Sequence, residues 1–97
     1  MKYLEFEWNK KKDTTNTKKH GVSFEEARTA FYDEYAIQFL DPEHSEEEDR
    51  FLLLGSSFNL KTLVVCHCFR EEETVIRIIS ARKADKDEEQ FYWSKRK

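Results

Sequence analysis

Residues 62–81 read TLVVCHCFREEETVIRIISA, and this stretch decides the fold. It holds two runs of β-branched and aliphatic residues, 62–70 and 74–81, which are separated by three glutamates. A connection this short cannot carry a parallel crossover, so the two runs are predicted to be neighbouring antiparallel strands. A third run of the same kind, residues 50–55, precedes them after a short connection and extends the predicted meander.

The N-terminal segment predicts a strand followed by a basic helix. In residues 3–8 the apolar side chains alternate with acidic ones, as a half-buried strand requires. Asn9 is a suitable N-cap for a helix that runs to about His20. Gly21 fits the position after the last helical turn, where a left-handed backbone is common.

A second helix is predicted to begin at Ser23 and to end near Asp33. Ser23 and Glu26 have the spacing of a capping box, in which the glutamate reaches back to the N-cap amide. Beyond it, residues 36–40 form a short apolar run that predicts a strand, and residues 83–95 predict a final helix.

The predicted order is therefore β-α-α-β-β-β-β-α, within a single domain that spans residues 1–97. This is an α+β fold: an antiparallel β-sheet of about five strands, with two N-terminal helices on one face and a C-terminal helix. The sheet should bury apolar side chains against the two N-terminal helices, among them Leu4, Phe6, Phe24, Phe31, Val64 and Ile78. The opposite face must be solvated or hold a site.

The charges are nearly balanced over the chain but unevenly distributed along it. A net charge of −3 is not typical of a strongly basic nucleic-acid binder. Residues 9–20, however, hold five lysines and one aspartate, whereas residues 41–49 hold six acidic residues. No apolar run approaches the roughly 20 residues that span a membrane, and no secretory signal is evident. We expect a cytoplasmic protein, because the two neighbouring cysteines indicate no disulfide framework.

Basic residues from separate predicted elements form a candidate site for a phosphodiester: Lys19, His20, Arg50, Arg70, Arg77 and Arg82. The alternative interpretation is that each arginine forms a structural ion pair with a carboxylate. Arg77 and Arg82 are an odd number of residues apart, so a regular strand would place them on opposite faces. They can share a site only if the chain bulges near Ser80-Ala81.

His67 is a candidate proton-transfer group on the open face of the sheet. Strand alternation turns it away from Cys66 and Cys68, which argues against a metal site formed by these three residues. A hydrogen-bonded structural histidine is the alternative. The acidic segment 41–49 lacks EF-hand spacing and is interpreted as a solvated loop or a contact patch for a basic partner. No cofactor motif and no zinc spacing is found in the sequence.

Three blocks of sequence carry a family resemblance. The first contains Phe6-Glu7-Trp8, Lys12, Asn16 and the run from Lys19 to Ala27; the second contains Asp41, His44-Ser45, Arg50 and Gly55; the third runs from Val75 to Ala84, with Glu88 and Tyr92. Together these blocks resemble the BrnT family of toxins. The family usually has Asp where this chain has Asn9, and Glu where it has Asp49.

The resemblance implies a RelE-like ribonuclease toxin of a type II toxin–antitoxin pair, which inhibits translation. Its partner would be a BrnA-like ribbon-helix-helix antitoxin, and the complex would bind operator DNA only through that antitoxin. Cleavage would proceed without a metal, by attack of the RNA 2′-hydroxyl. The residues implied are Lys19, His20, Arg77, Arg82 and His67 for catalysis, and Arg50, Arg70 and Tyr92 for RNA binding. A non-catalytic protein that works only within the regulatory complex is the alternative.

Overall fold

The computed structural model describes residues 4–41, 43 and 48–96. They form, in chain order, β1 (Glu5–Glu7), α1 (Lys10–His20), α2 (Phe24–Thr29), the 3₁₀ helix η1 (Ala30–Tyr32), β2 (Ile37–Leu40), β3 (Phe51–Ser56), β4 (Thr62–Arg70), β5 (Val75–Lys83) and α3 (Lys86–Lys95). The predicted α+β class and the order of its elements are confirmed. The strand β4 has the predicted limits, whereas β5 runs on to Lys83 and delays the start of α3 to Lys86.

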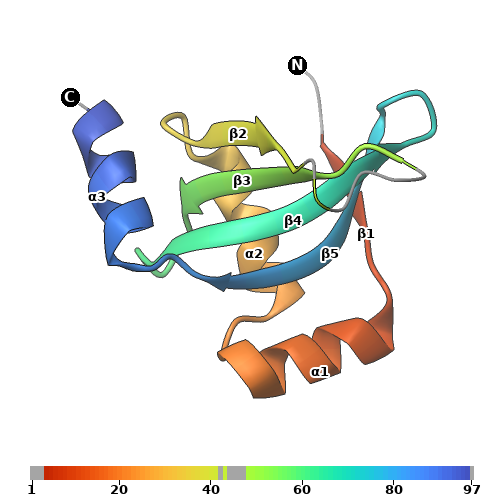
Figure 1. The fold of residues 1–97 in the computed structure, drawn as a ribbon. Coiled ribbons are helices and arrows are strands. Elements are labelled where there is room, and N and C mark those ends of the chain that lie inside the picture. The colour runs from red at the N-terminus through yellow and green to blue at the C-terminus, as the bar shows by residue number, and fades with distance from the viewer. Residues whose placement is uncertain (1–3, 42, 44–47, 97) are drawn as a thin grey trace.

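The strands form one sheet in the order β1-β5-β4-β3-β2 (Figure 1). The predicted antiparallel meander comprises β2 to β5. In contrast, β1 runs parallel to β5, with Phe6 opposite Ile76, so the sheet is mixed rather than wholly antiparallel. Two helices follow β1 before the chain re-enters the sheet, and a connection of that length permits either direction of pairing.

A β-bulge interrupts the pairing of β4 with β5. His67 lies opposite Ile78, but the preceding residue Cys66 lies opposite Ser80, which leaves Ile79 as the extra residue of β5. A bulge reverses the alternation of side chains beyond it. The predicted irregularity near Ser80-Ala81 is therefore confirmed, one residue earlier than expected.

The two faces of the sheet are covered differently. In Figure 1, α2 lies behind the sheet, α3 lies at one end of it, and α1 runs along the edge beside β5. One core cluster joins α2 to the sheet and contains Val22, Phe24, Ala27, Ala30, Leu53, Leu63, Val65, Ile78 and Ala81. The other face is covered at its end by Tyr92 of α3, which packs with Leu54 and Val64. Of the two N-terminal α-helices, α2 and not α1 covers the rear face, because α1 has no apolar side chain to bury.

The predicted core residues fall into three groups. Phe24 and Ile78 are fully buried as expected, and Phe6 and Phe31 are half-buried against the same cluster. Val64 is buried on the other face, beneath α3, because neighbouring residues of β4 point to opposite sides. Leu4 is exposed, since it precedes β1 and has no helix above it, so its predicted burial is wrong.

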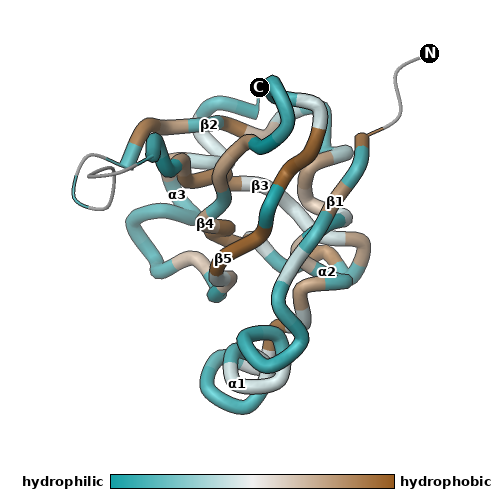
Figure 2. Tube along the Cα trace, turned by 90° about the vertical axis from the view of Figure 1, so that its right-hand side faces the viewer, coloured by the Kyte–Doolittle hydropathy of each residue, from teal (hydrophilic) through white to brown (hydrophobic). Residues whose placement is uncertain are grey.

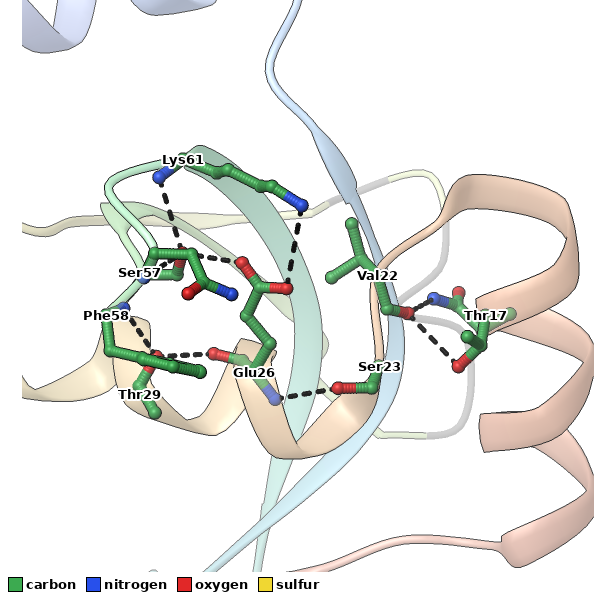
Figure 3. Close-up of polar contacts among 10 residues, drawn as sticks. Thr17, Val22, Ser23, Glu26, Thr29, Ser57, Phe58 and Lys61 are labelled. Carbon is green, nitrogen blue, oxygen red and sulfur yellow. Dashed lines mark hydrogen bonds and ion pairs between the residues drawn. The ribbon is translucent and has the colours of Figure 1, made fainter.

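The helix ends follow the predicted capping rules, with one exception in α2. The side chain of Ser23 accepts a hydrogen bond from the amide of Glu26 at 3.0 Å, as predicted. The Glu26 carboxylate does not reach back to the N-cap (Figure 3); it is buried and accepts a hydrogen bond from the hydroxyl of Ser57 at 2.7 Å. Lys61 lies 4.0 Å away from the same carboxylate. A buried carboxylate needs such partners, and here they fix the turn between β3 and β4.

Candidate functional site

The open face of β5 presents Arg77, Ser80 and Arg82 in one row. Across the bulge these residues lie opposite Cys68, Cys66 and Val64 of β4, which all share one face. The two arginines are therefore on the same face, as the bulge was expected to allow. Successive residues on one face of a strand are about 7 Å apart, so Ser80 lies midway between the two arginines.

Ser80 was missed as a site residue by the sequence reasoning. Regular alternation places it with Ile76 and Ile78, away from Arg77. The bulge at Ile79 moves it to the face of Arg77, where it lies opposite Cys66. Its neighbours in sequence give no signal of this change, because the bulge is defined by the pairing with β4.

A groove beside β5 brings Lys19 and His20 to the same place. It has a volume of about 320 Å³ and lies between α1 and the bulge. Its lining residues are Lys11, Lys12, Thr15, Asn16, Lys19, His20, Ile79 and Ser80. Ser80 belongs both to this groove and to the row on β5, so it lies between the groove that holds Lys19 and His20 and the face that carries Arg77 and Arg82.

The position of α1 depends on the side chain of Asn16. Its amide nitrogen donates to the carbonyl oxygens of Ala81, at 2.8 Å, and Val22, at 2.9 Å. Its amide oxygen accepts from the backbone N–H of Ala81 at 3.1 Å. Asn16 thus occupies the edge of β5 beyond the end of β1 as a neighbouring strand would, and it holds the basic helix beside the sheet.

The arginines of the open face are paired with carboxylates. Arg77 donates to Glu7 at 2.7 Å, and Arg82 holds both oxygens of Glu88, at 2.8 and 2.9 Å. Hydrogen bonding to Glu88 raises the pKa of Arg82, and hydrogen bonding to Arg82 lowers the pKa of Glu88. The ion pairs anticipated as the alternative for these residues are therefore present. They also fix the direction of each guanidinium group.

The match to known proteins covers most of the chain. Residues 8–88 match the family model described as the ribonuclease toxin BrnT of type II toxin–antitoxin systems. This chain belongs to the BrnT family. It is similar in fold to the BrnT ribonuclease toxin of Brucella abortus, known from a crystal structure at 1.1 Å resolution, with a TM-score of 0.67. The sequence identity is 22%, and the match covers 87% of this chain and 100% of that chain. No curated protein sequence matches this chain.

His67 of this BrnT family member lies in the core and not on the open face, so its predicted placement is wrong. It shares a face of β4 with Val65, is fully buried and packs edge-on against Phe31. Its ring nitrogens are hydrogen-bonded to the carbonyl oxygen of Val65 and to the side chain of Gln38, each at 3.0 Å. Burial lowers the pKa of His67. These contacts match the alternative of a structural histidine.

Tyr92 is also buried, although it was predicted to bind RNA. Its ring packs under α3 against Leu54 and Val64, and its hydroxyl donates to the carboxylate of Asp33. Burial and this carboxylate raise the pKa of Tyr92 to about 12. In the BrnT fold seen here, Tyr92 attaches α3 to the sheet and presents no surface to a ligand.

The two remaining predicted arginines lie near the other end of the open face. Arg70 ends β4 and lies 3.9 Å from Glu48. The backbone oxygen of Arg50 accepts from Asp41 at 2.8 Å. Both positive charges act on the thiol of Cys68, but burial dominates and raises its pKa. They belong to the same face as Arg77 and not to the groove at α1.

No metal cluster is evident in the described part of this BrnT-family chain. No group of three or more His, Cys, Asp or Glu side chains in residues 4–41, 43 and 48–96 is arranged to hold an ion. The acidic segment 41–49, with His44, lies in part outside these residues. Among the described helices, none is long and apolar enough to cross a membrane.

Proposed function

We propose that this BrnT-family toxin cleaves RNA by attack of a 2′-hydroxyl on the adjacent phosphate, without a metal ion. The observation that carries the proposal is the place of Ser80, which lines a groove with Lys19 and His20 of α1 and lies between Arg77 and Arg82 in the row on β5. A phosphate bound there would lie among positive charges on three sides. Such preorganised charge stabilises the pentacoordinate phosphorane more strongly than the ground state.

The arginines retain donors for this role despite their ion pairs. A guanidinium group carries five N–H donors. Arg77 uses one nitrogen to bind Glu7, and Arg82 uses its two terminal nitrogens on Glu88 while its Nε remains. The carboxylates hold the side chains in place, and the remaining donors contact the phosphate oxygens.

Proton transfer is assigned to the side chains of α1. His20 accepts the proton of the 2′-hydroxyl, or Lys19 assists it, as the new bond between 2′-oxygen and phosphorus forms. The bond from phosphorus to the 5′-oxygen then breaks, and a protonated side chain of the same pair donates a proton to that oxygen. The products are a 2′,3′-cyclic phosphate and a free 5′-hydroxyl, with no water consumed.

The partner in this proposal is a BrnA-like ribbon-helix-helix antitoxin, which inhibits the toxin and binds operator DNA in the complex. Family membership supports an antitoxin partner. Free toxin would degrade RNA and stop translation, whereas the complex would repress its own operon.

The test uses purified toxin and an end-labelled RNA in buffer with EDTA. We expect cleavage to persist in EDTA and to yield cyclic-phosphate ends, and we expect a 2′-O-methyl group to block cleavage at its own linkage. Loss of activity in EDTA that magnesium or zinc restores would contradict the metal-independent mechanism. Intact RNA, from a toxin that still binds its antitoxin and represses the operon in the complex, would favour the non-catalytic alternative.

A further inference from the structure

The helix α1 is polar on every side, which is unusual for a helix attached to a small domain (Figure 2). Its sequence, KKKDTTNTKKH, contains no apolar residue, and Asn16 is its one buried side chain. A helix at the surface of a domain is ordinarily held by an apolar stripe. Here the hydrogen bonds of Asn16 replace that stripe, and the five lysines of α1 are exposed.

Among the described residues, no carboxylate pairs with a lysine of α1, whereas Arg77 and Arg82 each have a carboxylate partner. The one acidic residue of the helix, Asp13, accepts hydrogen bonds from Thr17 and from the amide of Phe24, which turns it toward the core. In the described part of the chain, no ion pair forms at any of the five lysines. The positive charge of α1 is therefore available to a ligand, although the whole chain is acidic.

The lysines differ in where they point. Lys11, Lys12 and Lys19 line the groove between α1 and β5, whereas Lys10 and Lys18 do not. Ile79 and Ser80 line this groove on the side of β5, and α1, which is about 16 Å long, lines its other side. A strand of nucleic acid held at Ser80 would thus have its neighbouring phosphates beside these lysines.

We propose that the groove along α1 binds the phosphate backbone of the RNA strand next to the cleaved linkage. This inference rests on the proposed function for the identity of its ligand. Lysine ammonium groups are point charges that bind phosphates without demanding one geometry, so the contact is independent of sequence. An acidic protein segment is less suited, because stable protein interfaces need apolar anchors and Ile79 is the one apolar side chain lining the groove.

The test compares two variants of the same helix that lose equal charge. In Lys11→Gln/Lys12→Gln the charges are removed from the groove, and in Lys10→Gln/Lys18→Gln they are removed from outside it. The probe is a 2′-O-methyl oligouridine, which cannot be cleaved by 2′-hydroxyl attack. Its Kd is measured by fluorescence anisotropy at several salt concentrations, and circular dichroism establishes that both variants are folded.

We expect the groove variant to bind the probe about tenfold more weakly at low salt. Its slope of log Kd against log salt should decrease by about 1.4, which corresponds to two lost contacts with a single strand. The control variant should keep both the slope and the affinity of the unmodified protein within about twofold. Equal losses in the two variants would overturn the proposal, because a diffuse field and not the groove would then hold the RNA.

Two further outcomes separate the inference from the proposed function. If the groove variant binds the probe normally but binds the antitoxin more weakly, the groove is a protein interface and the inference is wrong. If the unmodified protein cleaves no RNA yet binds the probe through the groove, the proposed catalysis fails and the binding site stands. The uncleavable probe makes this distinction possible.

Discussion

Two basic regions of this toxin lie on either side of Ser80, and they are built in opposite ways. On β5, Arg77 and Arg82 are each bound to a glutamate, which holds each side chain in a fixed orientation. On α1, the lysines have no carboxylate partner among the described residues and extend from a polar helix. On β5, each positive charge is fixed in place and partly neutralised by a carboxylate. On α1, no described carboxylate neutralises the positive charges.

The difference corresponds to two physical tasks. Stabilising a transition state requires charges that are already oriented, because reorganisation during the reaction adds to the barrier. Attracting a polyanion requires charges that are not neutralised, whereas their orientation matters little. We therefore expect changes on β5 to affect mainly the rate of cleavage, and changes on α1 to affect mainly the binding of RNA.

The largest expected effect is on the fixed charges. Arg77→Ala and Arg82→Ala should each lower kcat for RNA cleavage about 10²–10³-fold, because each removes a preorganised donor to the phosphorane. KM should change much less than it does when groove lysines are replaced. The measurement is steady-state cleavage of a short RNA, with circular dichroism as the test of folding.

Arg28→Ala is the matched control for these two variants. Arg28 forms an ion pair with Glu25 on the exposed side of α2, so it resembles Arg82 in its pairing but not in its position. Its replacement should leave kcat unchanged. If Arg82→Ala is folded and as active as Arg28→Ala, then Arg82 is a structural ion-pair residue, and the contrast between the two regions fails.

A smaller effect is expected from replacing Asn16, the residue that holds α1 beside β5. Asn16→Ala should lower the free energy of unfolding by about 1–3 kcal/mol, because it leaves buried backbone groups of Ala81 without partners. It should also weaken RNA binding, since α1 would no longer lie beside β5. Chemical denaturation measures the first effect, and Asn59→Ala, at an exposed turn, is the control. A loss no larger than that of the control would show that α1 is held by other contacts.

The smallest effect concerns the carboxylate beside Arg82. Glu88→Gln should lower stability by up to about 1 kcal/mol at pH 7, because the pair is partly exposed. The pKa of Glu88 is lowered in the folded state, so its contribution is fully present above the ordinary value of 4.5 and is lost as the pH falls through the folded-state pKa. The free energies of unfolding of the two proteins should therefore converge as the pH falls below the folded-state pKa of Glu88. A difference in stability between the two proteins that persists below this pKa would mean that the Arg82–Glu88 ion pair is not its cause.

The local structure was predictable because its causes lie within a few residues. Asn9 caps α1 by accepting from the amide of Lys12, and Gly21 takes a left-handed φ of 69° at the other end. The limits of β4 follow from its run of β-branched and apolar residues and the turn after it. Lys19, His20 and the arginines could be named as candidates from their chemistry, and their role in a site stays a prediction.

What the sequence by itself determined is therefore the set of elements, their order and the cations available to the site. Only the tertiary structure decided which of these residues meet. The bulge at Ile79 brings Ser80 and both arginines to one face, and it exists only in the pairing of β5 with β4. Asn16 and its partner Ala81 are 65 residues apart, and Glu7 and Arg77 are 70 residues apart. Such contacts depend on strand register and on the docking of α1, which no local pattern of residues specifies.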